Sequence, residues 1–340
     1  MTPYAALLHA LIARDDLTAE DMAGAIGAMM DGTWSAVQAA AFLGALATKG
    51  ETLNEVVGAA RAIRARSVHV EHALEVVVDT CGTGGDGAQT INVSTAAGFV
   101  LAGCGVHVAK HGNRAASSAC GSADVLEAAG IALDESVELA RIRLERDRFA
   151  FLFAQRYHPA LRAVAPVRRE LGVRTIFNIL GPLANPARAT HQVIGVAKRA
   201  QLELVGNALF ELGAVAGAIV HARSGLDEVA GDAPTDVYQF SHAGIVRWTL
   251  EPAEFGVFSE PQALAGGTPL ENAASLEAIL SGERSARAEV VALNAALVLV
   301  VAGRAGDLFE GLALARTSLR DGAARAVFER LRNPAPVEYA

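Results

Sequence analysis

Two short segments of the chain concentrate the residue types that bind anionic ligands. The first carries four glycines within six positions, from Gly82 to Gly87. Because glycine lacks a Cβ, backbone N–H groups in such a segment can approach a ligand closely. The residues from Asn92 to Thr95 add hydroxyl groups where a helix is expected to begin, and a helix N-terminus favours an anion. A tight structural turn is the alternative explanation of the glycines alone.

The second segment runs from Lys110 to Ser122 and holds two cations, two glycines and three serines within thirteen positions. Only three of the 29 basic residues of the chain are lysines, so Lys110 hints at a place that needs a compact ammonium group. His111 alone would be interpreted as a core or surface histidine, but its neighbours Lys110 and Asn113 favour a binding role. Neither segment matches GxGxxG or GxxxxGK[ST], which disfavours typical dinucleotide and Walker-type sites.

An adjacent acidic pair, Asp227 and Glu228, follows a glycine and a predicted strand. Neighbouring carboxylates repel each other unless solvent or a hard cation lies between them. A solvated pair is the better explanation for an arbitrary Asp-Glu dipeptide, but the position after a strand favours a metal site here. Cys81 has no evident base beside it, so we expect a small buried residue rather than a nucleophile.

The elements that must position these segments alternate along the chain. Short strands are predicted over 76–79, 106–110, 149–153, 192–197 and 218–221, and helices over 94–103, 122–129, 135–147, 159–171 and up to 212. This alternation predicts a largely parallel sheet flanked by helices. Ligands of such sheets bind outside the carboxyl ends of the strands, which is where both segments and the acidic pair fall. Residues 237–249 are predicted as an antiparallel excursion and 275–332 as two long helices.

The first seventy residues show helical patterns alone, which predicts two domains. We expect a smaller all-helical N-terminal domain over residues 1–70, completed by helices within about 159–185, and an α/β domain over 71–340. The chain is 52% hydrophobic and 19% charged over 340 residues, which argues against disorder. The apolar run 290–303 is too short to span a bilayer and is interpreted as a buried helix.

Composition also restricts the possible binding partners and the cellular compartment. The net charge of −8 disfavours broad nucleic-acid binding, which needs a basic surface. Three widely spaced cysteines form no CxxC pair and are predicted to be free thiols in a reducing compartment. No signal peptide or membrane span is expected, so we predict a cytoplasmic protein with neither a membrane nor a nucleic acid as partner.

The order and spacing of the motifs resemble the anthranilate phosphoribosyltransferases. The resemblance rests on GTGGD at 82–86, NxST at 92–95 and KHGNRxxSS at 110–118, and it extends over nearly the whole chain through 121–127, 157–160, 167–186 and 225–228. It implies a fold like that of nucleoside phosphorylases and phosphoribosyltransferases, a homodimer, and an active site in the cleft between the domains.

The activity that this resemblance implies is a Mg²⁺-dependent transfer within tryptophan, and so aromatic amino acid, biosynthesis. The phosphoribosyl group of phosphoribosyl pyrophosphate (PRPP) would pass to the amine of anthranilate, giving N-(5-phosphoribosyl)anthranilate and pyrophosphate. The protein would thus be a glycosyltransferase that transfers a pentosyl group, with anthranilate and PRPP as its substrates.

The resemblance also implies roles for individual residues. PRPP would bind Gly82, Gly85, Asp86, Thr90, Asn92, Val93, Ser94, Thr95, Lys110, His111, Gly112, Asn113, Arg114, Ala115, Ala116, Ser117, Ser118 and Ser122. Anthranilate would bind Gly82, His111, Asn113, Arg168 and Pro182, and the metal would bind Ser94, Asp227 and Glu228. Catalysis is assigned to Lys110 and Arg168. An exposed helix end is the alternative explanation of the pair Arg168 and Arg169.

Two other functions share this architecture and stay open. A pyrimidine nucleoside phosphorylase would act at the same ribose carbon with phosphate as nucleophile, and it would need no acidic metal pair. A non-catalytic nucleic-acid-binding relative would need a basic groove, whereas this chain is acidic. Asp227, Glu228, Asn113 and Arg168 favour the transferase.

Overall fold

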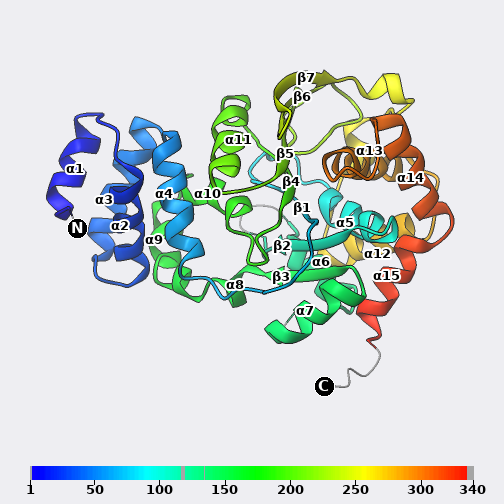
Figure 1. Cartoon of the computed structure of the whole chain (residues 1–340), viewed down its shortest axis with the longest axis horizontal. Coiled ribbons are helices and arrows are strands. Elements are labelled where there is room, and N and C mark those ends of the chain that lie inside the picture. Colours follow the sequence, from blue (N-terminus) through cyan, green and yellow to red (C-terminus); the bar gives the residue numbers. More distant parts are fainter. Residues whose placement is uncertain (1, 116–118, 134, 335–340) are drawn as a thin grey trace.

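The computed structural model describes residues 2–115, 119–133 and 135–334. Its centre is a seven-stranded sheet of order β3-β2-β1-β4-β5-β6-β7 (Figure 1). The first five strands pair in parallel and the last two antiparallel, which confirms the predicted largely parallel sheet and the antiparallel excursion. The strands are β1 (Val77–Gly82), β2 (His107–Gly112), β3 (Phe149–Phe153), β4 (His191–Gly195), β5 (Ala216–Ala222), β6 (Thr235–Ser241) and β7 (Gly244–Leu250).

The chain reverses its direction of travel through the sheet at β1. It moves from β1 to β2 and β3 on one side and then returns to β4 and β5 on the other. The carboxyl ends of β1 and β4 therefore lie at a topological switch point, where α/β sheets bind ligands. β1 extends three residues beyond the predicted strand, because Gly82 still pairs with Gly195.

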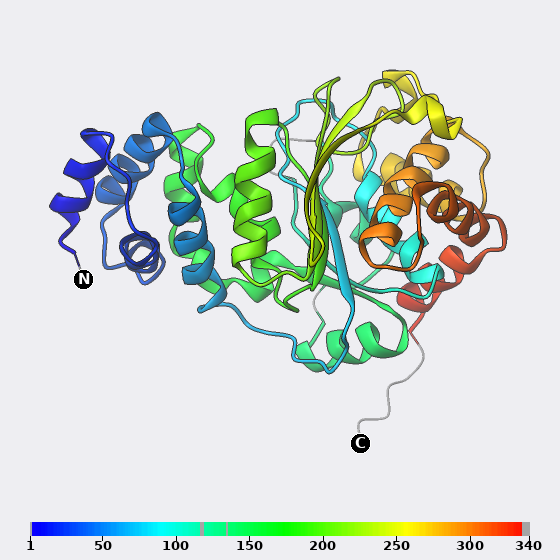
Figure 2. The ribbon, with the colours of Figure 1, turned by 45° about the horizontal axis from the view of Figure 1, so that its top comes forward.

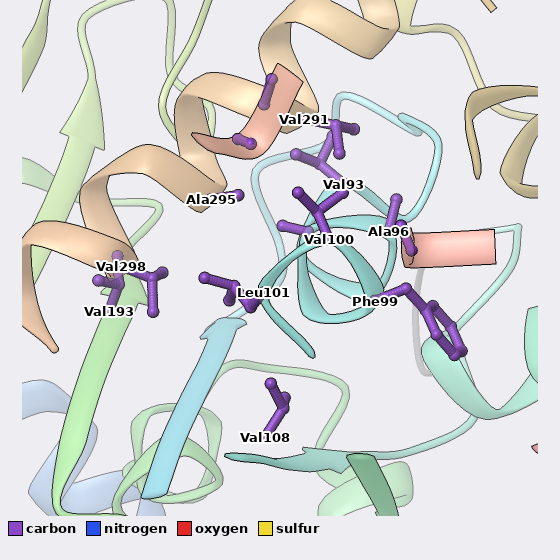
Figure 3. Packing of buried hydrophobic residues seen from close by; sticks show 14 of the residues in the cluster. Val93, Ala96, Phe99, Val100, Leu101, Val108, Val193, Val291, Ala295 and Val298 are labelled. Carbon is purple, nitrogen blue, oxygen red and sulfur yellow. The ribbon is translucent and has the colours of Figure 1, made fainter. Parts of the chain in front are cut away.

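The two faces of the sheet carry separate hydrophobic cores, since successive side chains of a strand point to opposite faces. Val193 and Ala218 face the core that contains α5 and α13, whereas their neighbours Ile194 and Ile219 face the core that contains α11 and α4. Figure 3 shows Val100 and Leu101 of α5 between the strands and α13. The helices on this first face are α5 (Val93–Gly103), α6 (Ser122–Ala128), α12 (Pro269–Leu280), α13 (Ala286–Val301), α14 (Leu308–Arg320) and α15 (Ala323–Arg332).

The helical region, formed by residues 4–64 and 165–180, lies beyond the second face, next to α11 (Leu202–Glu211) (Figure 2). Within residues 2–70 the regular elements are helices alone, as predicted: α1 (Tyr4–Ile12), α2 (Ala19–Met30), α3 (Ala36–Lys49) and α4 (Leu53–Arg64). Buried residues of α9 (Ala165–Leu171) and α10 (Phe177–Leu180) belong to the same core. The chain thus returns to the helical region after β3 and places the 165–180 segment opposite the carboxyl ends of the strands.

Three predicted helices differ in extent from the structure. The predicted helix over 159–171 is a 3₁₀ turn followed by α9, because Pro159 and Pro166 lack the N–H that a continuous helix requires. The two long helices predicted over 275–332 are four segments, the end of α12 followed by α13, α14 and α15. Gly282, Gly303 and Gly322 separate them in left-handed conformations that favour glycine.

The remaining elements are short or peripheral. Along the described chain no helix is both long and apolar enough to cross a membrane, and the apolar run 290–303 forms most of buried α13, as predicted. The other helices are α7 (Val137–Arg146) and α8 (Ala154–Tyr157), and the 3₁₀ turns are η1 (Pro159–Ala163), η2 (Pro182–Ala184), η3 (Arg199–Gln201), η4 (Pro252–Phe255) and η5 (Pro261–Leu264).

Candidate active site

A cavity of about 320 Å³ lies at the carboxyl ends of β1 and β2. It brings together the glycine segment, the start of α5, the end of β2 and the acidic pair after β5, which are far apart in the sequence. The predicted residues that line it are Gly82, Gly85, Asp86, Thr90, Asn92, Val93, Ser94, Thr95, Lys110, His111, Gly112, Asn113, Arg114, Ala115, Ser122, Asp227 and Glu228. Ala116, Ser117 and Ser118 lie outside the described residues.

A second cavity of about 230 Å³ adjoins the first and extends toward α9 and α10. The two cavities share Gly82, His111 and Asn113. Arg168 and Pro182 line the second cavity but not the first, together with apolar side chains such as Leu161 and Phe177. The five residues predicted to bind anthranilate therefore surround one cavity, and the polar cavity beside it holds most of the other predicted residues.

Asp227 packs against the ends of two strands. Its Oδ2 accepts a hydrogen bond of 2.6 Å from the Gly84 N–H. A Cβ on Gly82 would lie 2.1 Å from Asp227 Oδ2, and a Cβ on Gly195 would lie 1.6 Å from the Asp227 carbonyl oxygen. Both strand ends must therefore be glycine for the loop after β5 to cross them. The loop brings Asp227 into the cavity beside the glycine segment.

The carboxylates in this cavity are crowded. Burial and the nearby Asp86 charge raise the pKa of Asp227, and burial together with Asp227 raises the pKa of Glu228. Glu228 Oε1 accepts a hydrogen bond from the Ser94 N–H at the start of α5, 3.2 Å away. Because neighbouring ionised carboxylates repel one another, the arrangement of Asp86, Asp227 and Glu228 is suited to a cation that binds between them.

Lys110 lines the cavity but is almost fully buried, with 1% of its surface exposed. Its Nζ donates to the Thr80 carbonyl at 2.7 Å and to Ser94 Oγ at 3.3 Å. An ammonium group has three donors, so one remains for a ligand in the cavity. Asp79 is also buried, and burial raises its pKa to about 6 even though the Lys110 charge favours ionisation.

Two buried histidines form a hydrogen-bonded pair between the cavities and α4. His111 Nδ1 lies 3.1 Å from the Gly181 carbonyl, which can only accept, so Nδ1 carries the hydrogen. In the neutral ring Nε2 then accepts from His158 Nε2–H at 3.0 Å, and His158 Nδ1 accepts from the Ser67 hydroxyl at 2.7 Å. Both ring nitrogens of His111 are thus engaged, which leaves it no lone pair to act as a general base.

The histidine pair predicts a specific loss of stability in acid. Burial lowers the pKa of His111 to about 3 and that of His158 to about 4. The unfolded chain protonates both near pH 6.5, so the stability of the neutral pair is fully present above that pH and is lost as the pH falls toward the folded values. Between pH 6.5 and 5 each histidine should lower the free energy of unfolding by roughly 2 kcal/mol. Urea unfolding of wild type and His158→Asn at several pH values measures this, and equal pH slopes for the two proteins would contradict it.

The two arginines assigned to the site differ in their partners. The Arg114 guanidinium is held by Glu127 at 2.7 Å and by Asp124 at 3.0 Å, so it lines the cavity with its charge already paired. Arg168 makes no ion pair with any described residue, lies over the Phe177 ring at 5.2 Å, and has its pKa lowered by burial. Arg168 is therefore a half-buried cation whose charge is not balanced by a carboxylate of the described residues.

Several residues near the site were not singled out from the sequence. His158 orients His111 from α8's C-terminal end, and Asn185 donates to Asp79 Oδ2 at 2.8 Å. Arg174 and Asn178 line the larger cavity from the helical side. The runs 157–160 and 167–186 contain all four, but a sequence pattern alone does not show which of its polar residues turn toward the strand ends.

Both parts of the chain match one family of known proteins. Residues 5–67 match the helical bundle domain of a glycosyl transferase family, and residues 74–325 match the a/b domain of the same family. With the cavity of glycines, hydroxyl groups and a lysine at the strand ends, these matches define the protein as a member of this glycosyl transferase family.

Individual relatives indicate which members of this glycosyl transferase family the chain resembles. The anthranilate phosphoribosyltransferases of Thermomicrobium roseum and Roseiflexus castenholzii are 47% and 50% identical, over 96% and 93% of this chain and 95% and 94% of theirs. Among solved structures, that of the Thermus thermophilus enzyme matches with a TM-score of 0.91 at 42% identity, over 96% of this chain and 98% of that one. The chain belongs to the anthranilate phosphoribosyltransferases, which act in tryptophan biosynthesis, and this confirms the resemblance.

Solved structures of one relative contain ligands. The Saccharomyces cerevisiae anthranilate phosphoribosyltransferase in complex with PRPP and Mg has a TM-score of 0.89 to this chain at 27% identity, over 97% of each chain. The same yeast enzyme has been solved in complex with 4-fluoroanthranilate. One relative thus binds both kinds of ligand that the site was predicted to hold.

Proposed function

We propose that this chain transfers the phosphoribosyl group by binding PRPP in the larger cavity and anthranilate in the smaller one, with the residue roles given above. The observation that carries the proposal is the joining of the cavities at Gly82, His111 and Asn113. A polar cavity of glycine N–H groups, hydroxyls and a lysine suits a polyanion. A more apolar cavity with an arginine that forms no ion pair among the described residues suits an aromatic carboxylate.

We propose that Mg²⁺ binds Ser94, Asp227 and Glu228 together with PRPP. Within the described chain no group of three or more His, Cys, Asp and Glu side chains could hold a metal ion. Two carboxylates and a hydroxyl nevertheless fit Mg²⁺, because this ion is commonly held by one or two carboxylates, water and substrate phosphates. Burial raises the pKa values of both carboxyls, and the charges of Asp86 on Asp227 and of Asp227 on Glu228 raise them further, which supports a cation at this position. When bound, the ion neutralises negative charge on the pyrophosphate.

The chemistry needs charge stabilisation more than proton transfer. The amine of anthranilate is neutral near pH 7 and attacks ribose C1, the bond from C1 to the pyrophosphate oxygen breaks, and the nitrogen then releases a proton. The engaged ring nitrogens of His111 fit a reaction without a strong general base. Lys110 and the N–H groups of the glycine segment stabilise the departing pyrophosphate, and Arg168 with Asn113 orients anthranilate.

We also propose a homodimer and the domain division predicted from the sequence, residues 1–70 with helices within 159–185 and residues 71–340. Exposed apolar side chains on the helical region support a partner surface, with Ile12 of α1 67% exposed and Val37 of α3 78% exposed. Sedimentation equilibrium should give twice the chain mass of 35.2 kDa. A mass of one chain would contradict the dimer.

A lysine exchange tests the proposed PRPP site. Lys110→Arg keeps the charge, but a planar guanidinium cannot occupy the buried ammonium position between Thr80 and Ser94, so kcat/KM for PRPP should fall about tenfold or more. Lys198→Arg makes the same exchange on the surface and should leave the kinetics unchanged. Steady-state rates of both variants provide the measurement. Wild-type kinetics for Lys110→Arg would remove Lys110 from the mechanism.

A further inference from the structure

Arg174 connects the helical region to the glycine segment. It lies between α9 and α10, and its Nη1 donates a hydrogen bond of 2.7 Å to the Gly84 carbonyl. A Cβ on Gly85 would lie 1.4 Å from this nitrogen, and Gly85 has a φ of +80°. The left-handed backbone of Gly85 therefore favours glycine, and a side chain at this position would displace the Arg174 guanidinium.

The other terminal nitrogen of Arg174 is buried without a partner. Nη2 makes no hydrogen bond within the part of the chain that the structure describes, and Arg174 forms no ion pair there. The residue lines the larger cavity together with Asp86 and the acidic pair. A buried N–H group of a cation that lacks an acceptor is costly, and a ligand in the larger cavity can supply the acceptor.

The larger cavity has three carboxylates and few cations that are free to bind a ligand. Asp86, Asp227 and Glu228 all line it, and of the cations predicted from the sequence Arg114 is paired with Asp124 and Glu127. Lys110 already donates twice within the protein. Even with the proposed Mg²⁺ at the acidic pair, a ligand with several phosphate groups therefore meets little available positive charge on the strand side of the cavity.

We propose that Arg174 binds a phosphate-group oxygen of PRPP through Nη2 while Nη1 holds the Gly84 carbonyl. The inference rests on the proposed assignment of the larger cavity to PRPP and adds to it a cation from the helical region. A guanidinium suits this double task because its donors form a rigid fork. Arg168 and Arg174 then give the same segment of chain one contact with each substrate.

The competing explanation is a structural clamp that only shapes the glycine loop. Three variants separate the two: Arg174→Gln, Arg174→Lys, and Arg169→Gln as the control that removes an exposed arginine from the neighbouring surface. Thermal unfolding without ligand establishes that each variant is folded. Calorimetric titration then measures the Kd of PRPP, of pyrophosphate and of ribose 5-phosphate, each with Mg²⁺.

For a direct contact, Arg174→Gln should weaken PRPP binding about tenfold or more, since the lost bond is charge-assisted. Arg174→Lys should bind PRPP more tightly than Arg174→Gln, and Arg169→Gln should bind like wild type. Weaker pyrophosphate binding would place the contact at the leaving group, and weaker ribose 5-phosphate binding would place it at the 5′-phosphate.

Other outcomes overturn the inference. An unchanged PRPP Kd in Arg174→Gln would do so, and so would weaker PRPP binding with both smaller ligands unaffected, which indicates a loop effect. If Arg174→Gln does not fold, Arg174→Lys decides, and PRPP binding equal to that of wild type with a lower kcat would indicate a clamp alone. A wild-type chain that fails to bind PRPP would instead remove the proposed function of the cavity.

Discussion

Asp227→Asn combined with Glu228→Gln should lower kcat/KM by on the order of a hundredfold to a thousandfold at millimolar Mg²⁺, because the charge stabilisation that a bound cation supplies is worth several kcal/mol. The concentration of Mg²⁺ needed for half-maximal activity should rise as well. Initial rates over a series of Mg²⁺ concentrations measure both effects. An unchanged Mg²⁺ dependence in the double variant would show that the metal binds elsewhere.

The double variant should remain folded for a structural reason. Asp227 accepts from the Gly84 N–H and Glu228 from the Ser94 N–H, and an amide oxygen can accept the same bonds. Neutral amides also remove the repulsion that raises the pKa values of the two carboxyls. Asp232→Asn is the matched control, because Asp232 is an exposed acid after the same strand and does not line the cavity.

Arg168→Ala should raise the KM for anthranilate tenfold to a hundredfold and leave the KM for PRPP within about twofold, since a charge-assisted hydrogen bond is worth roughly 1.5–3 kcal/mol. Arg168 lines the smaller cavity without an ion-pair partner among the described residues. Burial lowers its pKa, so the ionised guanidinium gains from a carboxylate that binds beside it. Steady-state kinetics with each substrate varied in turn give both constants.

Arg169→Ala is the control for this prediction. Arg169 is adjacent in sequence but exposed, and it lies outside the smaller cavity. Its removal should change neither KM. Equal effects of Arg168→Ala on both substrates, or a larger effect of Arg169→Ala, would mean that the anthranilate carboxylate binds another residue.

The glycine segment and the lysine segment could be located from the sequence because strand ends mark them. Strand, glycine cluster and polar helix start recur in one order, and parallel strands bring their carboxyl ends to one edge of the sheet. The same argument placed Asp227 and Glu228 beside them. What the pattern does not contain is the return of the chain after β3, which brings Arg174 and His158 to this edge from a region with no strand to mark it.

The sequence indicated which residues lie near the site, but it did not indicate which side chains pair with one another. Arg114 and Arg174 both lie near glycines and within runs that carry the family resemblance, and the sequence favoured Arg114 because it follows a predicted strand end together with Lys110. Only the folded chain shows that Asp124 and Glu127, one helical turn apart on α6, neutralise Arg114. Likewise, the apolar run through 275–332 predicts helices, but its divisions depend on single glycines with positive φ.

The most direct test of the central claim follows the fluorescence of anthranilate after addition of the protein, PRPP and Mg²⁺. We expect a progressive loss of anthranilate fluorescence with all three present, and no loss when PRPP or Mg²⁺ is left out or when Asp227 and Glu228 are replaced together. Constant fluorescence with every component present would contradict it. Cleavage of a pyrimidine nucleoside by inorganic phosphate in the same preparation would then assign the chain's fold and cavities to phosphorolysis instead.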